Sequence, residues 1–180
     1  MTEVPCHVVW AMPSRWTFRV RPIREFVYRY AIGVGVDPFS GNSTIATHRN
    51  DLGRGGIDAA EWCWQLVERG VVADYVLFDP PYSPRQIAEC YKGIGRDVTT
   101  KDTQSAVLYA AVREPLWRLL RPGGVALSFG WSSAGFGKDA EDVEMLLVRH
   151  GGAHNDTICI AQRKPAPVAA AGDLFEQAAA

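Results

Sequence analysis

The chain has 180 residues, of which 47% are hydrophobic and 22% are charged. This length suits one domain with a full core, and the composition excludes a disordered, collagen-like or coiled-coil protein. The formal net charge of −1 rules out a general electrostatic attraction to nucleic acid but does not exclude a local basic face.

The first half of the chain alternates strand patterns with helix patterns. Residues 7–12 favour a short strand, and a helix with Pro22 in its first turn follows and extends to residue 30. The run 31–37 predicts a buried strand, and residues 48–52 predict a second short one. After a glycine turn, Asp58 is expected to cap a helix whose apolar positions continue to residue 67.

The second half begins with a continuous apolar strand at residues 74–78, which leads directly into Asp79. The later signals predict, in order, helix 85–91, loop 92–102, helix 108–119 kinked or broken near Pro115, turn 121–124, strand 125–131, a helix from Asp139 through Leu147, turn 151–152 and strand 157–162. Residues 165–180 are mostly Ala and Pro, so we expect a disordered tail after a single domain of residues 1–164.

The cysteines and histidines give no sign of a metal or disulfide site. The four cysteines lack a paired short spacing, and His150 and His154 have no third ligand at matching spacing, so no metal is expected. No apolar run approaches the roughly 20 residues that cross a bilayer, and the first residues lack a basic stretch and a cleavage site. We therefore expect a cytoplasmic protein with no membrane partner.

The alternation of strands and helices predicts an α/β fold with a mainly parallel sheet covered on both faces. Such sheets bind ligands outside the carboxyl ends of their strands. Two predicted strand ends carry unusual chemistry, at residues 37–43 and 79–82. We expect the functional site at these strand ends.

The segment Asp79-Pro80-Pro81-Tyr82 is stiff, because each proline has a fixed φ and restricts the residue before it. A carboxylate beside free backbone carbonyls, followed by an aromatic ring, suits a flat group with an exocyclic amine, such as adenine or cytosine. Taken alone, the same four residues are equally consistent with a strand that ends in a rigid turn with a solvent-facing aspartate.

These four residues match the catalytic motif Asp/Asn/Ser-Pro-Pro-aromatic of the amino-methyltransferases, so the sequence resembles the S-adenosylmethionine-dependent enzymes that methylate adenine N6 or cytosine N4 in DNA. Their cofactor loop, Asp-Pro-Phe-x-Gly-x-Gly, is similar to residues Asp37, Pro38, Phe39, Ser40, Gly41, Asn42 and Ser43, with Ser43 in place of the last glycine. The resemblance covers residues 10–163. Within the family, the sequence is most similar to small phage or prophage DNA adenine methyltransferases, which share the run 78–86.

The resemblance implies a three-layer Rossmann-like methyltransferase fold and S-adenosylmethionine as the cofactor. It implies that Asp51 holds the cofactor ribose, that Asp58 reaches its adenine amino group, and that Phe18 and Pro22 precede the cofactor loop and help to hold the methionine part. Asp79, at the meeting point of cofactor and target, and the Pro80 carbonyl would accept the protons of the target amine, and Tyr82 would stack on the base. The chain would then act in the cytoplasm of a bacterium or of a phage-infected host cell.

Further substrate contacts are expected on the same rim of the sheet. Trp131 follows a predicted strand and is either a stacking residue or part of the core. Arg85, Lys92 and Arg96 flank the catalytic segment and would meet phosphates, unless they belong to an ordinary solvated loop. A chain of this size would grip duplex DNA more easily as a homodimer.

The leading hypothesis is a DNA adenine-N6 methyltransferase acting on a flipped or single-stranded base. An RNA or cytosine-N4 methyltransferase would use the same two motifs. A cofactor- or DNA-binding accessory protein without turnover is the other alternative, favoured by Ser43 and by the lack of a separate target-recognition domain.

Overall fold

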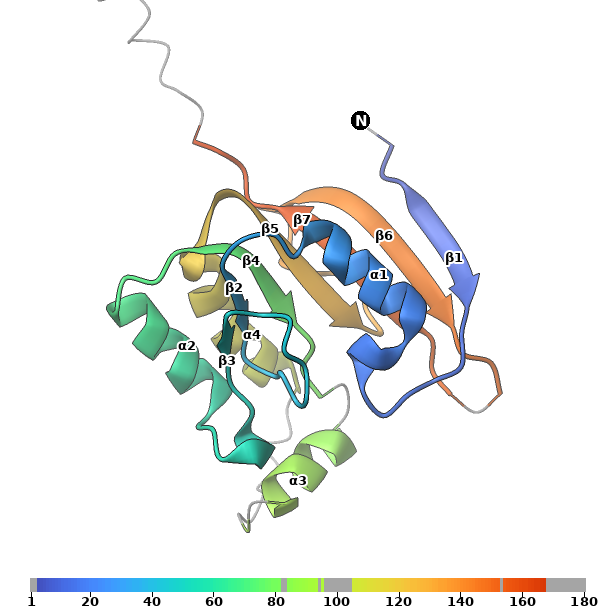
Figure 1. The fold of residues 1–180 in the computed structure, drawn as a ribbon, viewed down its shortest axis with the longest axis horizontal. Helices are drawn as coiled ribbons and strands as arrows, with labels where there is room; N and C mark the ends of the chain where they lie inside the picture. The colour runs from blue at the N-terminus through green and yellow to red at the C-terminus, as the bar shows by residue number, and fades with distance from the viewer. Residues whose placement is uncertain (1–2, 82–83, 94, 96–104, 153, 168–180) are drawn as a thin grey trace, which may run out of the picture.

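The computed structural model describes residues 3–81, 84–93, 95, 105–152 and 154–167. Within them, seven strands form one sheet in the order β1-β6-β7-β5-β4-β2-β3 (Figure 1). Neighbouring strands are parallel, except that β7 is antiparallel to both β5 and β6. The strands are β1 Cys6–Trp10, β2 Gly35–Asp37, β3 His48–Arg49, β4 Ala73–Phe78, β5 Leu120–Gly130, β6 Glu141–Arg149 and β7 Thr157–Arg163.

Helices cover both faces of this sheet. They are the α-helices α1 Arg21–Tyr30, α2 Ala59–Glu68, α3 Pro84–Gly93 and α4 Ser105–Leu119, and the short 3-10 helices η1 Thr17–Arg19 and η2 Leu52–Arg54. α1 lies on one face, α2 and α4 lie on the other, and α3 lies beyond the edge at which β4 ends (Figure 1). The result is a three-layer structure, as expected.

β4 shows how the strands connect the layers. Its side chains alternate between two buried clusters: Tyr75 and Leu77 pack with α1, whereas Val76 and Phe78 pack with α2 and α4. A strand that is buried on both faces has no solvent-exposed face, so its sequence is a continuous apolar run instead of alternating polar and apolar residues. The predicted strand 74–78 is therefore confirmed.

The predicted helices around Pro22 and after Asp58 are confirmed as α1 and α2. α1 has its proline in the first turn, where the missing N–H costs no hydrogen bond. The carboxylate of Asp58 accepts hydrogen bonds from the backbone N–H groups of Ala60 and Glu61, at 2.9 and 3.2 Å, and so caps α2. The helices predicted before and after the loop 92–102 correspond to α3 and α4. Pro115 lies inside α4, which continues to Leu119, so the helix is not broken there.

The helix predicted from Asp139 is wrong, because residues 141–149 form strand β6. Glu144, Leu146 and Val148 are buried at every second position, which is the period of a strand. Val143, Leu146 and Leu147 suggested a helix because they are three or four positions apart, but pairing with β1 and β7 makes the segment a strand.

Three boundaries also differ from the sequence prediction. The strand predicted over 31–37 is shortened to β2, because Gly33 bends the chain with a φ of +91° and the Val34 N–H bonds to the Asp74 carboxylate at 2.7 Å. The strand predicted over 48–52 ends at residue 49, where η2 soon follows. The turn predicted at 121–124 lies inside β5, as an irregularity between the pairs Ala73–Leu120 and Tyr75–Val125.

This strand order, with antiparallel β7 between β5 and β6, is that of the Rossmann-like methyltransferase fold, so the fold-class prediction is confirmed. Because β2, β3 and β4 are parallel, their carboxyl ends lie at the same edge. The domain boundary at 164 stays a prediction, and residues 168–180 of the tail lie outside the described part. No helix in the described residues is long and apolar enough to cross a membrane.

The packing of β2 against β4 gives a test of the fold. A Cβ atom at Gly35 would lie 2.2 Å from Cζ of the buried Tyr75 ring. We expect Gly35→Ala to lower the free energy of unfolding by about 1–3 kcal/mol, because the ring cannot move without disturbing the core. Val72→Ala, at a position that is 61% exposed, is the control and is expected to change it by less than about 0.5 kcal/mol. Urea denaturation of both variants gives the comparison, and equal stability of the two would contradict this packing.

Candidate functional site

A cleft of about 920 Å³ opens at the carboxyl ends of β2, β3 and β4. Six segments of the chain line it: η1 with the residues before it, α1, the loop after β2, the stretch from β3 to the start of α2, the segment after β4, and α3. The two predicted motifs, far apart in the sequence, therefore face one cavity.

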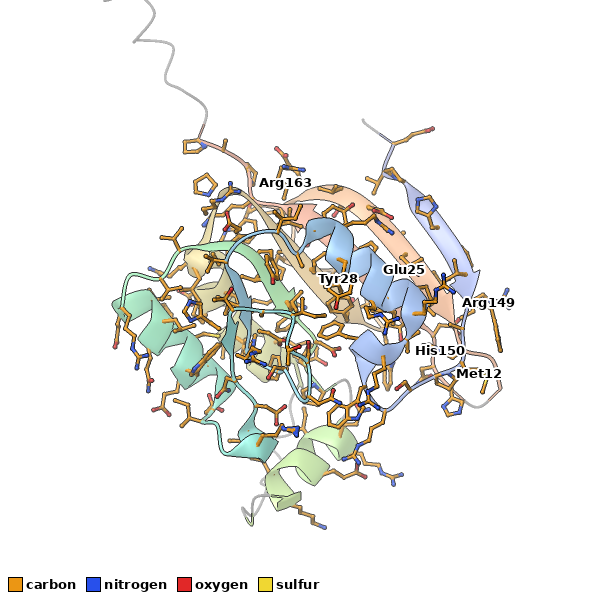
Figure 2. All side chains as sticks on the ribbon, in the orientation of Figure 1. Met12, Glu25, Tyr28, Arg149, His150 and Arg163 are labelled. Atoms are coloured by element: carbon orange, nitrogen blue, oxygen red, sulfur yellow. The ribbon has the colours of Figure 1, made fainter. Side chains whose placement is uncertain are left out.

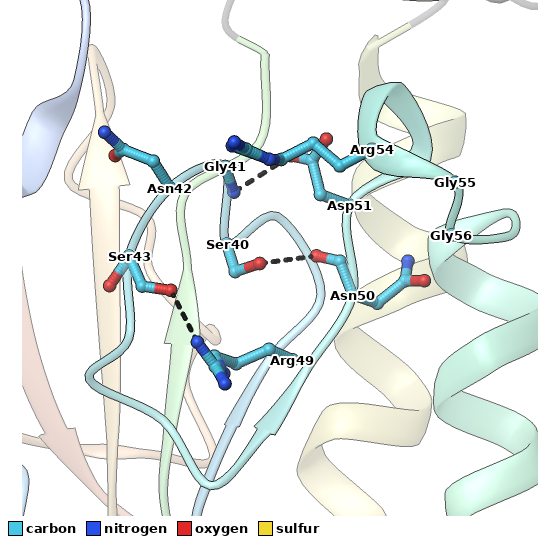
Figure 3. Close-up of a pocket in the computed structure, with 10 residues that line it drawn as sticks. All are labelled: Ser40, Gly41, Asn42, Ser43, Arg49, Asn50, Asp51, Arg54, Gly55 and Gly56. Carbon is cyan, nitrogen blue, oxygen red and sulfur yellow. Dashed lines mark hydrogen bonds between the residues drawn. The ribbon is translucent and has the colours of Figure 1, made fainter.

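The loop after β2 is tied to the loop after β3 by a set of hydrogen bonds (Figure 3). The backbone N–H and the hydroxyl of Ser40 both donate to the Asn50 carbonyl, at 2.9 and 3.1 Å. The Gly41 N–H donates to the Asp51 carboxylate at 2.9 Å, and the Asn50 N–H donates to the Asp37 carbonyl at 2.9 Å. These bonds fix the shape of the predicted cofactor loop.

Asn50 holds the second loop together with its side chain, a role that the sequence analysis missed. Its amide oxygen accepts from the Ile57 N–H at 3.1 Å and its amide nitrogen donates to the Ile57 carbonyl at 2.9 Å. The residue is only 6% exposed. The available signal in the sequence was the pair Asn50-Asp51 after a short predicted strand. The pair alone does not show which of the two side chains faces the cofactor.

Asp37 lies below the cleft rather than in its lining, and it is fully buried. One carboxylate oxygen accepts from the Phe39 N–H at 3.0 Å, while the other has no hydrogen-bond partner among the described residues. Burial, with smaller contributions from the charges of Asp79 and Asp51, raises the pKa of Asp37 to about 8 despite the lowering effect of the Phe39 bond. Asp37 is therefore mostly protonated at neutral pH, and it stabilises the loop through its hydrogen bond with the Phe39 N–H.

Pro38 to Ser43 all line the cleft. Gly41 has a φ of +53°, and a Cβ atom there would lie 2.6 Å from the Trp16 ring, so both the backbone and the packing require glycine. Ser43 replaces a glycine of the expected motif without backbone strain, because its φ is negative. Its N–H donates to the Ser40 carbonyl at 2.7 Å, and its hydroxyl accepts from the Ile45 N–H at 3.3 Å.

The two predicted cofactor carboxylates both reach the cleft. Asp51 lines it while accepting the Gly41 N–H bond. Asp58 lines it from the start of α2, where the same carboxylate caps the helix. Phe18 also lines the cleft and packs edge-on against Phe129, with ring centroids 5.1 Å apart. Pro22 does not line this cleft but a second cavity on the other side of α1.

Asp79, Pro80 and Pro81 line the cleft directly after β4. Asp79 is half-buried and Pro80 is buried. The Pro81 carbonyl accepts a hydrogen bond from the Tyr109 hydroxyl at 3.0 Å, which anchors the rigid turn to α4. Tyr82 lies outside the described residues.

The predicted substrate contacts are not gathered in the cleft. Arg85 and Lys92 are exposed on α3 and do not line it, and Arg85 forms an ion pair with Glu89 at 2.8 Å. Trp131 is 47% exposed at the end of β5 and does not line the cleft either. Arg96 lies outside the described residues.

Several cleft-lining residues were not among the predicted site residues. Six of them are basic or aromatic and come from η1 with its flank, from α1 and from η2: Arg15, Trp16, Arg19, Arg24, Tyr28 and Arg54. A dense run of arginines and aromatic residues at 15–30 was visible in the sequence. Its direction toward the cleft depends on how α1 packs on the sheet.

Comparisons with known proteins add similarity in fold. No protein-family model matches the sequence, and a search of curated proteins gives no match. Among solved structures, the chain is similar to TrmN from Thermus thermophilus, with 17% identity, 79% of this chain and 48% of that chain covered, and a TM-score of 0.49. It is also similar to the N-methyltransferase NodS from Bradyrhizobium japonicum WM9, with 10% identity, 91% and 87% covered, and a TM-score of 0.41. A third is the putative methyltransferase yhhF from Escherichia coli, with 10% identity, 86% and 92% covered, and a TM-score of 0.42.

The chain spans about half the length of the Thermus protein. At these identities and scores, the similarities carry no argument about activity. The residues of the cleft must supply that argument.

The buried Asp37 predicts a pH-dependent stability. The folded chain keeps a proton on this carboxyl up to about pH 8, whereas the unfolded chain releases it near pH 3.8. Folding is therefore penalised as the pH rises between these values, by up to about 1.4 kcal/mol per pH unit. Asp37→Asn keeps an acceptor for the Phe39 N–H but has no proton to lose.

We expect the wild type to lose stability relative to Asp37→Asn between about pH 6 and about pH 8, by urea denaturation at each pH. A stability difference that stays constant over this range would contradict a protonated Asp37.

Proposed function

We propose that the protein is an S-adenosylmethionine-dependent methyltransferase that acts on the exocyclic amine of a nucleic-acid base, with adenine N6 in DNA as the favoured target. One observation carries the proposal. Asp79 and its two prolines line the same cleft as the loop of residues 38–43 and the carboxylates of Asp51 and Asp58.

The donor and acceptor groups of the cleft fit the cofactor. Its nucleoside offers two hydroxyl groups and an amino group as hydrogen-bond donors, and Asp51 and Asp58 are acceptors on the cleft wall. Gly41 has no side chain, so the loop presents bare backbone at this position. Phe18 and Phe39 provide apolar surface in the cleft. When bound, the cofactor supplies a methyl group on a positively charged sulfur.

Asp79 and Pro80 would act by accepting the two amine protons of the base. The amine lone pair is delocalised into the ring, and hydrogen bonds at these acceptors direct it toward the methyl group. As the new N–C bond forms, positive charge develops on nitrogen, and the Asp79 carboxylate stabilises it. The extra amine proton then leaves to water. The Tyr109 bond to the Pro81 carbonyl keeps the turn in place during this step.

The protonated Asp37 supports this role for Asp79. Two neighbouring carboxylates that were both ionised would repel each other, and the pKa of Asp37 is raised to about 8 chiefly because it is buried. A neutral Asp37 leaves the negative charge on the group that faces the target.

A base in a duplex must leave the stack to reach Asp79, at a cost of roughly a few kcal/mol.

The direct test is transfer of a labelled methyl group from S-adenosylmethionine to unmethylated DNA and RNA, single- and double-stranded, with nucleoside mass spectrometry of the product. N6-methyladenine in DNA supports the proposal in full. N4-methylcytosine or methylated RNA overturns the choice of target. Cofactor binding without transfer to any of these substrates overturns the assignment as an enzyme and favours an accessory protein that binds the cofactor without turnover.

Asp79→Ala is expected to reduce the transfer rate by at least about 100-fold, because it removes the carboxylate that stabilises the developing charge. Affinity for S-adenosylhomocysteine, measured by calorimetric titration, is expected to change much less. Asp139→Ala, at an exposed position outside the cleft, is the matched control and should keep the wild-type rate. Transfer by Asp79→Ala at the control's rate would reject the assignment.

Asp58 has two roles that substitutions can separate. Serine keeps an oxygen that can cap α2, whereas alanine does not. We expect both Asp58→Ser and Asp58→Ala to weaken S-adenosylhomocysteine binding by about 10-fold to 100-fold, because each loses the charged acceptor. Asp58→Ala alone should also lose about 0.5–2 kcal/mol of stability with the cap. Wild-type affinity in Asp58→Ser would show that the carboxylate does not bind the cofactor.

A further inference from the structure

We propose that Arg15, Arg19 and Arg24 form a wall of the cleft that binds the phosphodiester backbone of the target strand. This inference rests on the proposed function for the nature of the ligand, but not for the geometry. All three arginines line the same cleft as Asp79. None of the three is among the phosphate contacts expected from the sequence, which are Arg85, Lys92 and Arg96.

α1 separates its charged residues onto two sides. Arg24 and Tyr28 are four positions apart, one helical turn, and both line the cleft. Glu25 and Arg29 line the second cavity beside β1 and β6. Figure 2 shows Tyr28 and Glu25 on different sides of the helix. Arg24 therefore faces the cleft because of its position in the helical repeat.

The ion pairs follow the same division. Arg21 pairs with Glu25 at 2.7 Å, and Arg29 pairs with Glu144 at 2.5 Å. Within the described residues, no ion pair neutralises Arg24, Arg15 or Arg19. The two paired arginines of α1 thus do not line the cleft, whereas Arg24, which lines it, has no ion pair among the described residues.

The wall is joined to the cofactor loop through Trp16. The Arg15 guanidinium lies over the Trp16 ring, 5.2 Å from its centroid, and the same ring packs against Gly41. Stacking restricts the arginine and holds it near the loop. Tyr28, which is 58% exposed, adds an aromatic surface to the same wall. Basic side chains with aromatic rings among them are typical of sites that bind single-stranded nucleic acid.

The charges of the cleft are arranged by sign. Asp51 and Asp58 lie between β3 and α2 and Asp79 follows β4, whereas Arg15, Arg19 and Arg24 come from η1, its flank and α1. Arg54 of η2 and Glu89 of α3 also line the cleft, so the division by sign holds for the two groups of residues and not for every charge. A nucleotide has the matching arrangement, with N–H donors on its base and a negative charge on its phosphate. A base amine directed at Asp79 leaves the backbone to meet the arginines, whose planar groups can bind phosphate oxygens in pairs.

Fluorescence anisotropy with labelled oligonucleotides tests the wall, using Arg24→Ala and its helix neighbour Arg21→Ala as a matched pair. We expect Arg24→Ala to weaken binding about 5-fold to 10-fold and to lower the slope of log K against log salt by about 0.7–0.9, the value of one lost phosphate contact. Arg21→Ala should bind as the wild type does. DNA and RNA oligonucleotides, single- and double-stranded, serve as separate probes of which backbone is bound.

A second variant and a second ligand keep the test independent of folding and of the proposed function. Arg19→Ala is expected to behave like Arg24→Ala, and both should bind S-adenosylhomocysteine with unchanged affinity. Equal oligonucleotide binding by Arg24→Ala and Arg21→Ala would overturn the proposal that the wall binds phosphate, even if methyl transfer occurs. Loss of binding confined to the cleft arginines, with no transfer to any substrate, would support the wall and overturn the proposed function instead.

Discussion

The cleft depends on the hydrogen bonds that join the loop after β2 to the loop after β3. The Asn50 backbone takes part at both ends, donating to the Asp37 carbonyl and accepting from Ser40. Its side chain holds Ile57, close to the cap of α2 at Asp58. A shift in this connection would move Gly41, Asp51 and Asp58 together. The geometry of the cofactor side thus follows from two short strands, β2 and β3, which contribute five residues between them.

The electrostatics of the cleft follow from which groups the fold buries. Asp37 is enclosed and neutral, so it supports the loop without competing with the carboxylates above it. Asp79 stands in the cleft beyond the end of β4, on a turn made rigid by two prolines. Arginines of η1 and α1 line the same cleft. One cavity therefore presents both hydrogen-bond acceptors and cations, which is the combination that a nucleotide requires.

Local signals predicted the elements that they control. The aspartate cap and helical spacing of α2, the proline of α1 and the apolar run of β4 each act within a few residues, and each was found in the sequence. β6 was missed because Val143, Leu146 and Leu147 have helical spacing and because its partner β1 lies more than 100 residues away in the chain. The arginines of the cleft were missed for a related reason: which side of α1 faces the cleft is set by packing of Phe26 and Ile23 on the sheet, not by nearby sequence. Pro22 was assigned to the cofactor by its motif, yet it lines the other cavity.

A crystal structure with S-adenosylhomocysteine tests the central claim most directly, namely that one cleft brings the cofactor and the amine acceptors together. We predict the nucleoside of the ligand between Asp51 and Asp58, in contact with the loop of residues 38–43, and its sulfur on the side of Asp79. A ligand bound in the cavity beside Pro22, or a cleft that stays without ligand at saturating concentration, would contradict this arrangement.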